Sequence, residues 1–341
     1  MTAPLLPGAA PVVVPRPLPS WVVTAQQAAA EPPKPEIHMG QRRRAPFASH
    51  REIANRLAED VTDAWFKARG GSQHAIPIGV VAALALVVVK DEAGPDLGDQ
   101  FLALDPAELG AVLKDIWGIT WYRHPYLIQC ALPLHEWLTV PEPDPEILHA
   151  VHKTAHAAIN SGLFQITSHQ DPGLRTDTDV LSRLIMDMST KAKRLADGEF
   201  HTPDPACDLM AQVLLGQKDF TPGMSFMDPA AGSGGMLRAA AAHLRDHGHD
   251  PADYEWYGND INEIAVACLA VNSIIWGLGP NVVIAKADSL ADPGWPTRAR
   301  AERAEVIAHR NRVVELAATE AAHRRAIRLL TQLTEPLERT A

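Results

Sequence analysis

Apolar residues recur at helical spacing through most of the first half of the chain. Ser49 is a residue type that caps helix N-termini, and a helix is predicted directly after it. Its apolar face consists of Ile53, Leu57, Val61 and Trp65. Residues 76–89 form the most apolar stretch. They are too few to cross a bilayer, which takes about 20 residues, so we predict a buried core helix. Further helices are predicted at about 106–117, 126–138, 144–160 and 176–196, and together these segments predict an α-helical domain at residues 47–196.

The second half of the chain alternates between short apolar runs and helical patterns. Strand-like runs end near Met227, Asn259 and Ala287, and the alanine-rich stretch Met236–His247 is typical of a helix. This alternation predicts an α/β fold with a Rossmann-like sheet over residues 197–296.

Residues 297–341 have the pattern of a helix rich in Ala, Arg and Glu. Its apolar positions are Val306, Val313, Leu316, Ala317, Ile327, Leu330 and Leu333. A solvated helix that packs on the domain edge is the first interpretation. The alternatives are a helix that binds a protein partner, and read-through sequence after a truncated gene.

The first 46 residues have a different composition. They hold ten of the 28 prolines and no sustained period, so we expect a disordered tail. The prolines and the lack of a basic start argue against a signal peptide. Arg42, Arg43 and Arg44 at its end are interpreted as a solvated charge run.

Charge and cysteine content limit the possible functions. A net charge of −10 argues against a protein whose whole surface neutralises DNA phosphates, so contact with DNA needs a local basic face or a partner subunit. The three cysteines form no C-x-x-C pair, which favours reduced, buried thiols and a cytoplasmic location. His149, His152 and His156 have no carboxylate or cysteine at ligand spacing, so no metal site is predicted.

The strongest candidate for chemistry is a glycine loop at residues 228–235. An apolar run ends in Asp228, turns through Gly232, Gly234 and Gly235, and enters a helix. Glycine allows a tight turn and a close approach to a ligand, and the helix N-terminus behind the loop offers free N–H groups. The loop departs from the dinucleotide pattern G-x-G-x-x-G because the last glycine is missing.

Acids at three successive strand ends indicate which ligand the loop binds. Asp228 suits an ammonium group, Asp260 a ribose diol, and Asp288 an exocyclic adenine amine. This set favours S-adenosylmethionine over a dinucleotide with its anionic pyrophosphate.

Four segments in this order resemble N6-adenine DNA methyltransferases, most of all the modification subunit of type I restriction-modification systems. The segments are 198–203 (GEFHTP), 228–235 (DPAAGSGG), 258–262 (GNDIN) with 270–272 (AVN), and 287–290 (ADSL). The resemblance covers roughly residues 190–292 and, more loosely, the helical region before them. It implies DNA as substrate, a specificity subunit as partner, and a helical N-terminal domain that helps to hold both.

The resemblance also implies the residues that bind S-adenosylmethionine. The segment that folds over the cofactor is Phe200, His201, Thr202 and Pro203. The methionine-binding loop is Asp228, Pro229, Ala230, Gly232, Ser233, Gly234 and Gly235. The ribose side is Asp260 with Ile261, and the adenine side is Asp288 with Ser289 and Leu290.

One family motif has no counterpart. The family grips the flipped adenine with Asn/Asp/Ser-Pro-Pro-aromatic after a fourth strand, and no such tetrapeptide occurs here. Asp292-Pro293-Gly294-Trp295 comes too soon after Asp288 and is interpreted as a loop turn. No residue is therefore assigned to catalysis. Three interpretations stay open. The first is an adenine-N6 DNA methyltransferase, and the second is a non-catalytic subunit of a DNA-modification complex that binds the cofactor or serves as a scaffold. The third is a remnant without a closed fold.

Overall fold

A computed structural model describes residues 49–69, 73–89, 94–189, 202–216 and 218–334, with side chains up to Leu330. The proline-rich segment 1–46 and the predicted site residues Phe200 and His201 lie outside these ranges. Residues 48–341 form one compact unit by their contacts. The domain boundary expected near residue 196 stays a prediction.

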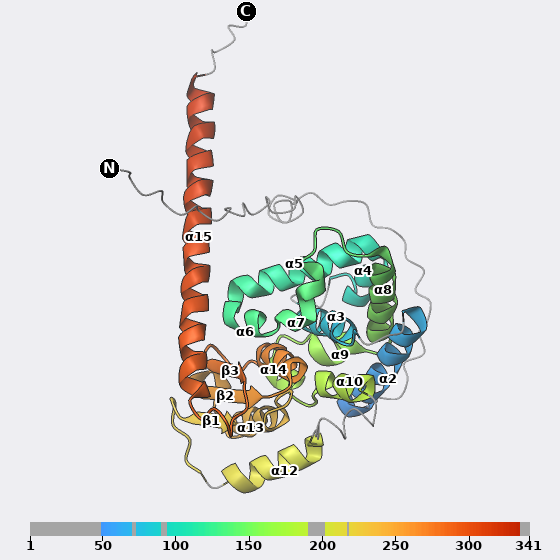
Figure 1. Ribbon diagram of the computed structural model, residues 1–341, viewed down its shortest axis with the longest axis vertical. Helices are drawn as coiled ribbons and strands as arrows, with labels where there is room; N and C mark the ends of the chain where they lie inside the picture. Colours follow the sequence, from blue (N-terminus) through green and yellow to red (C-terminus); the bar gives the residue numbers. More distant parts are fainter. Residues whose placement is uncertain (1–48, 70–72, 90–93, 190–201, 217, 335–341) are drawn as a thin grey trace, which may run out of the picture. The chain divides into compact units, whose positions relative to one another are not determined.

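The described strands form a small parallel sheet in a helix-rich, mixed α/β fold (Figure 1). The strands are β1 (Ser225–Asp228), β2 (Glu255–Asp260) and β3 (Val282–Lys286), and they lie side by side in that order. Asp228 is in register with Gly258, and Asp260 with Lys286. The carboxyl ends of all three strands therefore meet at one edge of the sheet.

Among the described residues from 49 to 189, all the regular structure is helical. They are α2 (His50–Ala68), α3 (Ala75–Ala85), α4 (Leu97–Leu102), α5 (Pro106–Arg123), α6 (Pro125–Cys130), α7 (Leu132–His135), η1 (Glu136–Leu138), α8 (Pro145–Asn160), α9 (Leu163–Thr167), η2 (Pro172–Arg175) and α10 (Val180–Met188). A capping box between Ser49 and Glu52 starts α2, as its sequence predicts. Residues Ile76 to Ala85 of α3 are all buried, and none of the described helices is long and apolar enough to cross a membrane.

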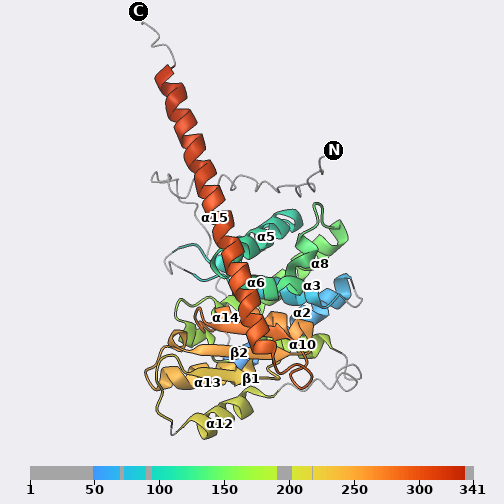
Figure 2. The ribbon, with the colours of Figure 1, turned by 60° about the vertical axis from the view of Figure 1, so that its left-hand side comes forward.

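Four longer helices surround the sheet. They are α12 (Asp204–Leu215), α13 (Gly235–Asp246), α14 (Glu263–Ile275) and α15 (Trp295–Thr334), with the short η3 (Pro251–Asp253) before β2. The helix α13 lies between α12 and β1, and α14 packs on β2 and β3. The first part of α15 packs on β3 and α6 (Figures 1 and 2).

One apolar core runs from the helices into the sheet. The helix α14 is buried on nearly every side because it contacts the sheet on one face and α3, α6, α7 and α10 on others. Tyr126 on α6 adds a polar link, since its hydroxyl donates to the carbonyl of Ile284 (2.5 Å) and accepts from the amide of the same residue (3.0 Å). The helical region thus holds the outer edge of β3 in place.

Several predicted element boundaries need correction. The single helix expected at 126–138 is divided into α6, α7 and η1, because Pro133 cannot continue a helix that began before it. The helix expected from residue 176 begins at Val180, after the N-cap Asp179, and the short helix α4 had no predicted counterpart. The loop turn at Asp292–Gly294 is confirmed, and α15 starts directly after it.

Candidate functional site

The glycine loop connects β1 to α13 and has the backbone geometry that requires glycine. Gly232 and Gly234 have φ values of 56° and 102°, a region that side chains with a Cβ rarely adopt. A Cβ on Gly234 would also lie 2.6 Å from a methyl carbon of Leu269 and 3.0 Å from the ring of Trp276. The loop therefore turns tightly and packs directly on α14 before α13 begins.

Asp260 at the end of β2 fixes this loop. One carboxylate oxygen accepts the amide of Gly232 at 2.8 Å, and the other accepts the amide of Asn262 at 2.8 Å. The carbonyl of Asn259 accepts the amide of Ala231 at 2.8 Å. Each oxygen of Asp260 keeps a further lone pair, so the carboxylate can still accept hydrogen bonds from a ligand.

Asp228 lies at the carboxyl end of β1, the strand next to β2. Its carboxylate accepts the amide of Ala230 at 3.0 Å. Burial raises the pKa of Asp228, and the nearby carboxylate of Asp260 raises this pKa further, although the bond from Ala230 opposes the shift. A cation beside the two carboxylates would relieve their repulsion.

A cavity of about 620 Å³ opens at the carboxyl ends of the strands. Its lining combines loop, strand ends and helix starts: Asp179, Ser182, Thr202, Asp204, Cys207, Asp228, Ala230, Ala231, Gly232, Ser233, Gly235, Met236, Asp260, Ile261, Asn262, Glu263, Ala265 and Lys286. Five of these side chains are carboxylic acids and one is a lysine, which is paired with Glu263 at 2.7 Å. Since Glu263 is paired with this lysine and Asp204 with Arg183 and Arg238, the carboxylates of Asp228 and Asp260 are the groups that favour a ligand with positive charge.

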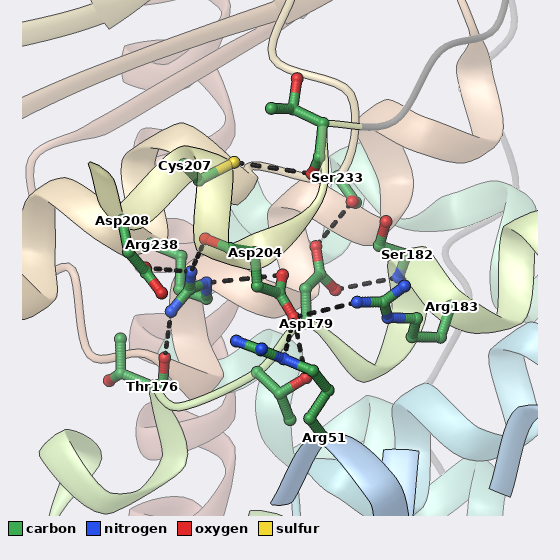
Figure 3. A network of polar contacts seen from close by, with 12 residues as sticks. Arg51, Thr176, Asp179, Ser182, Arg183, Asp204, Cys207, Asp208, Ser233 and Arg238 are labelled. Atoms are coloured by element: carbon green, nitrogen blue, oxygen red, sulfur yellow. Dashed lines mark hydrogen bonds and ion pairs between the residues drawn. The ribbon is translucent and has the colours of Figure 1, made fainter. Parts of the chain in front are cut away.

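Asp179 supports the glycine loop from the helical region. Its carboxylate accepts the hydroxyl of Ser233 at 2.6 Å and the backbone amide of Ser182 at 2.9 Å (Figure 3). It also accepts the side-chain amide of Asn272 at 2.9 Å. The residue is only 1% exposed, and burial raises its pKa. Asp179 is also the N-cap of α10. Neither this role nor the contact with the loop was predicted from the sequence.

A second buried cluster joins α12 to α13. Asp204 is 4% exposed and lies within 3.4 Å of Arg183 and 4.0 Å of Arg238, which is itself only 2% exposed. Arg238 also donates to the carbonyl of Thr176 at 2.8 Å and to Asp208 at 2.5 Å (Figure 3). These ion pairs hold the start of α12, and with it Thr202, beside the glycine loop.

The structure brings together about half of the site residues predicted from the sequence. Those that line the cavity are Thr202, Asp228, Ala230, Gly232, Ser233, Gly235, Asp260 and Ile261. Pro203, Pro229, Gly234, Asp288, Ser289 and Leu290 are not among the lining residues. Asp288 is exposed, and its carboxylate caps the amides of Leu290 and Ala291. Leu290 itself is 95% exposed.

Several lining residues were not predicted as site residues: Asp179, Ser182, Asp204, Cys207, Ala231, Met236, Asn262, Glu263, Ala265 and Lys286. Ala231 and Asn262 lie inside the quoted motifs but were not assigned to the site, and Met236 directly follows the glycine loop. Asp179 and Lys286 reach the cavity only through tertiary packing and strand register.

The comparisons with known proteins agree with the resemblance at the level of the family. Residues 178–310 match the family described as N-6 DNA Methylase, and this segment contains the glycine loop, all three strands and the cavity. This segment is therefore similar to the N-6 DNA methylases, the family that its motifs resemble. None of the curated proteins matches the chain.

One similar solved structure is the methyltransferase subunit of a type I restriction-modification system from Streptococcus thermophilus. The two chains are 18% identical with a TM-score of 0.39, and the match covers 72% of this chain and 60% of that one. This chain thus spans less than two thirds of the similar structure.

Proposed function

We propose that the cavity at the glycine loop binds S-adenosylmethionine. The observation that carries this proposal is the joint placement of Asp228, Asp260 and the glycine loop around one acid-lined cavity. Its volume of about 620 Å³ lies in the range of ordinary small-molecule sites. The cofactor carries an ammonium and a sulfonium group, which suit carboxylates, whereas the pyrophosphate of a dinucleotide would be repelled.

The residues of the site then have distinct roles. Asp260 orders the loop through its two backbone bonds and accepts the ribose hydroxyls with its remaining lone pairs. Asp228 faces the positive charge of the methionine part. The resemblance assigns the segment from Phe200 to Pro203 to the cover over the adenine ring. It assigns Asp288, Ser289 and Leu290 to the other side of that ring, although these three residues do not line the cavity. The bound cofactor supplies the activated methyl group.

The proposed reaction is methylation of the N6 atom of adenine in DNA, within a Rossmann-like methyltransferase fold. The family match over residues 178–310 supports this substrate class. The net charge of −10 supports a division of labour in which a specificity subunit provides most of the DNA contact. We place the chain in a restriction-modification type of system, in the cytoplasm.

A second function is supported by a specific feature of the sequence. No Asn/Asp/Ser-Pro-Pro-aromatic tetrapeptide occurs in the chain, and β3 is followed by the long helix α15. The alternative is therefore a non-catalytic subunit that binds the cofactor, or acts as a scaffold, beside a partner that grips the adenine.

Calorimetric titration of S-adenosylmethionine into the full chain tests the site. We expect a Kd on the order of micromolar, equivalent to about −8 kcal/mol. Asp228→Ala and Asp260→Asn should each weaken binding by at least about tenfold. Asp250→Ala is a matched control, because Asp250 also accepts a backbone amide at 2.9 Å but lies at the start of η3, outside the cavity. A folded chain without affinity for the cofactor would refute the proposal.

Transfer of a labelled methyl group to DNA distinguishes the two functions. Incorporation of label into adenine by the chain alone would establish a complete methyltransferase. Cofactor binding without incorporation, even after a specificity subunit that contacts DNA is added, would establish the non-catalytic subunit. Incorporation only in the presence of that subunit would support the proposed division of labour.

A further inference from the structure

The second half of α15 extends beyond the rest of the described unit (Figures 1 and 2). The first half packs on β3 and α6, and Arg310 still donates to the carbonyl of Tyr122 at 2.9 Å. Every residue from Glu315 to Leu330 is exposed. Most helical stability in proteins comes from packing of an apolar face, so this exposed stretch would be stabilised by a surface to pack on.

The exposed part of this helix has apolar residues at coiled-coil spacing. Leu316, Ile327 and Leu330 are 71%, 49% and 62% exposed, and Val313 lies half-buried where α15 leaves the other helices. In a heptad these four residues occupy a and d positions. The two positions between them, one a and one d, are filled by Glu320 and His323.

The pattern is complementary to itself when the helix is reversed. In an antiparallel pair, Val313 lies opposite the partner's Leu330, and Leu316 lies opposite the partner's Ile327. The same register places Glu320 opposite the partner's His323, and the symmetry of the pair repeats each layer. We propose that α15 forms an antiparallel coiled coil with α15 of a second copy of this chain.

Charge favours this orientation over the parallel one. A parallel pair would place Glu320 against Glu320 and His323 against His323, which brings like groups together. The antiparallel pair places an acid opposite a base in both central layers. Glu320 already accepts a hydrogen bond from Arg324 of its own helix at 2.9 Å. That contact can remain in the dimer because Arg324 occupies a flanking e position.

The flanking positions also permit close approach. Ala317 lies near the partner's Arg324, and Thr319 lies near the partner's Ala326 in this register. No like charges meet at these e and g positions, and the small side chains let the helices approach each other. The polar central layers fix the register at some cost in stability, so we expect a dimer of moderate affinity.

Sedimentation equilibrium of the full chain over a wide concentration range tests the dimer. We expect reversible association, and Ile327→Glu should raise the dimer Kd by at least about tenfold because it places a charge in two apolar layers. Ala318→Glu is the matched control, since it adds the same charge at an exposed f position of the same helix and should leave the Kd unchanged. A wild-type chain that stays monomeric at about 100 μM, or equal effects of the two variants, would overturn the proposal.

Disulfide trapping tests the orientation. A mixture of Leu316→Cys and Ile327→Cys chains should form a covalent heterodimer on mild oxidation, whereas Leu316→Cys alone should not form a homodimer through this position. The wild-type chain is the control, because Cys207 and Cys268 are buried and Cys130 is half-buried. Efficient homodimer formation by Leu316→Cys alone would instead establish a parallel pair and contradict the register.

Because the interface lies on α15 and not at the cavity, this inference does not depend on the proposed cofactor. A dimer without affinity for S-adenosylmethionine would refute only the function, and a cofactor-binding monomer would refute only the dimer.

Discussion

At the residue scale, the protonation state of the Asp228 carboxyl determines how strongly the cavity binds a cation. Burial and the neighbouring Asp260 raise its pKa above the usual value near 3.8. The protein without ligand therefore keeps a proton on this group at a pH where a free aspartate is ionised. A cationic ligand prefers the ionised form, so binding below the raised pKa requires the loss of that proton.

Affinity for S-adenosylmethionine should consequently fall as the pH is lowered through the raised pKa of Asp228, and level off above it. Asp228→Asn should bind more weakly and lose this part of the pH dependence, while Asp250→Asn keeps the wild-type profile. Titrations across the acidic range provide the measurement. An unchanged profile in Asp228→Asn would show that another group accounts for the dependence.

Asp179 is the residue whose removal should most disturb the loop from a distance. Asp179→Ala leaves the hydroxyl of Ser233 and the amide of Asn272 buried without their acceptor. We expect a loss of about 2–3 kcal/mol in the free energy of unfolding, measured by urea denaturation. Asp177→Ala, at a residue whose side chain is 60% exposed, should cost less than about 1 kcal/mol. Similar losses in both variants would contradict the supporting role of Asp179.

These residues also show what the sequence can predict at this scale. Asp228, Asp260 and the glycines follow from a local strand–turn–helix pattern, and the structure places most of that set around one cavity. Asp179 lies 54 residues before Ser233, and nothing local connects them. Asp204 and Lys286 likewise reach the cavity through the packing of separate elements.

At the element scale, the outer edge of β3 is protected by a side chain. The Tyr126 hydroxyl satisfies both the amide and the carbonyl of Ile284, which would otherwise be buried and unpaired. Tyr126→Phe should therefore lower the free energy of unfolding by about 1–3 kcal/mol. Thermal and urea unfolding provide the measurement. Tyr122→Phe, at a residue 54% exposed on the neighbouring helix α5, should have little effect in both experiments. A neutral Tyr126→Phe would mean that water replaces the hydroxyl.

The helix α12 carries apolar residues on two opposite faces. Cys207 and Ala211 pack against α13, while Leu209, Met210, Val213 and Leu214 are 45–74% exposed. Val213→Lys should preserve the unfolding free energy and reduce binding of a hydrophobic dye, because it removes part of an exposed apolar patch. Ala211→Lys, at 3% exposure, should destabilise the chain by more than about 2 kcal/mol. Destabilisation by Val213→Lys would show that this face is covered in solution.

Element types are better predicted here than element boundaries. The three strands, the glycine turn and the helical character of residues 295–334 follow from periodicity. The helix predicted at residues 126–138 is divided near Pro133. The sequence alone did not show this division, because the effect of Pro133 depends on which neighbouring turns pack on α3 and α14. The exposed face of α12 has no local signal, because an apolar position looks the same whether or not another element covers it.

At the scale of the whole unit, the continuous core determines how residues 48–341 unfold. Apolar contacts run without a break from Ile53 on α2 to Ile284 on β3, through the buried helix α14. We therefore expect the helical region and the sheet to melt in one cooperative transition. Calorimetry provides the test, and two separated transitions would instead support independent domains on either side of residue 196.

Ligand linkage connects this transition to the site. If S-adenosylmethionine binds only the folded chain, a concentration of 100 times its Kd stabilises that chain by about 2.7 kcal/mol. Asp260 accepts a hydrogen bond from the glycine loop, and the loop packs on Leu269 and Trp276 of the common core. The bound cofactor should therefore raise the melting temperature of the whole unit and not only that of the sheet. Asp260→Asn should melt below the wild type even without the cofactor, because its amide nitrogen cannot accept the second backbone N–H, and it should shift little when the cofactor is added. A normal shift in Asp260→Asn would place the cofactor elsewhere in the molecule, because the loop and its acid would then contribute nothing to binding.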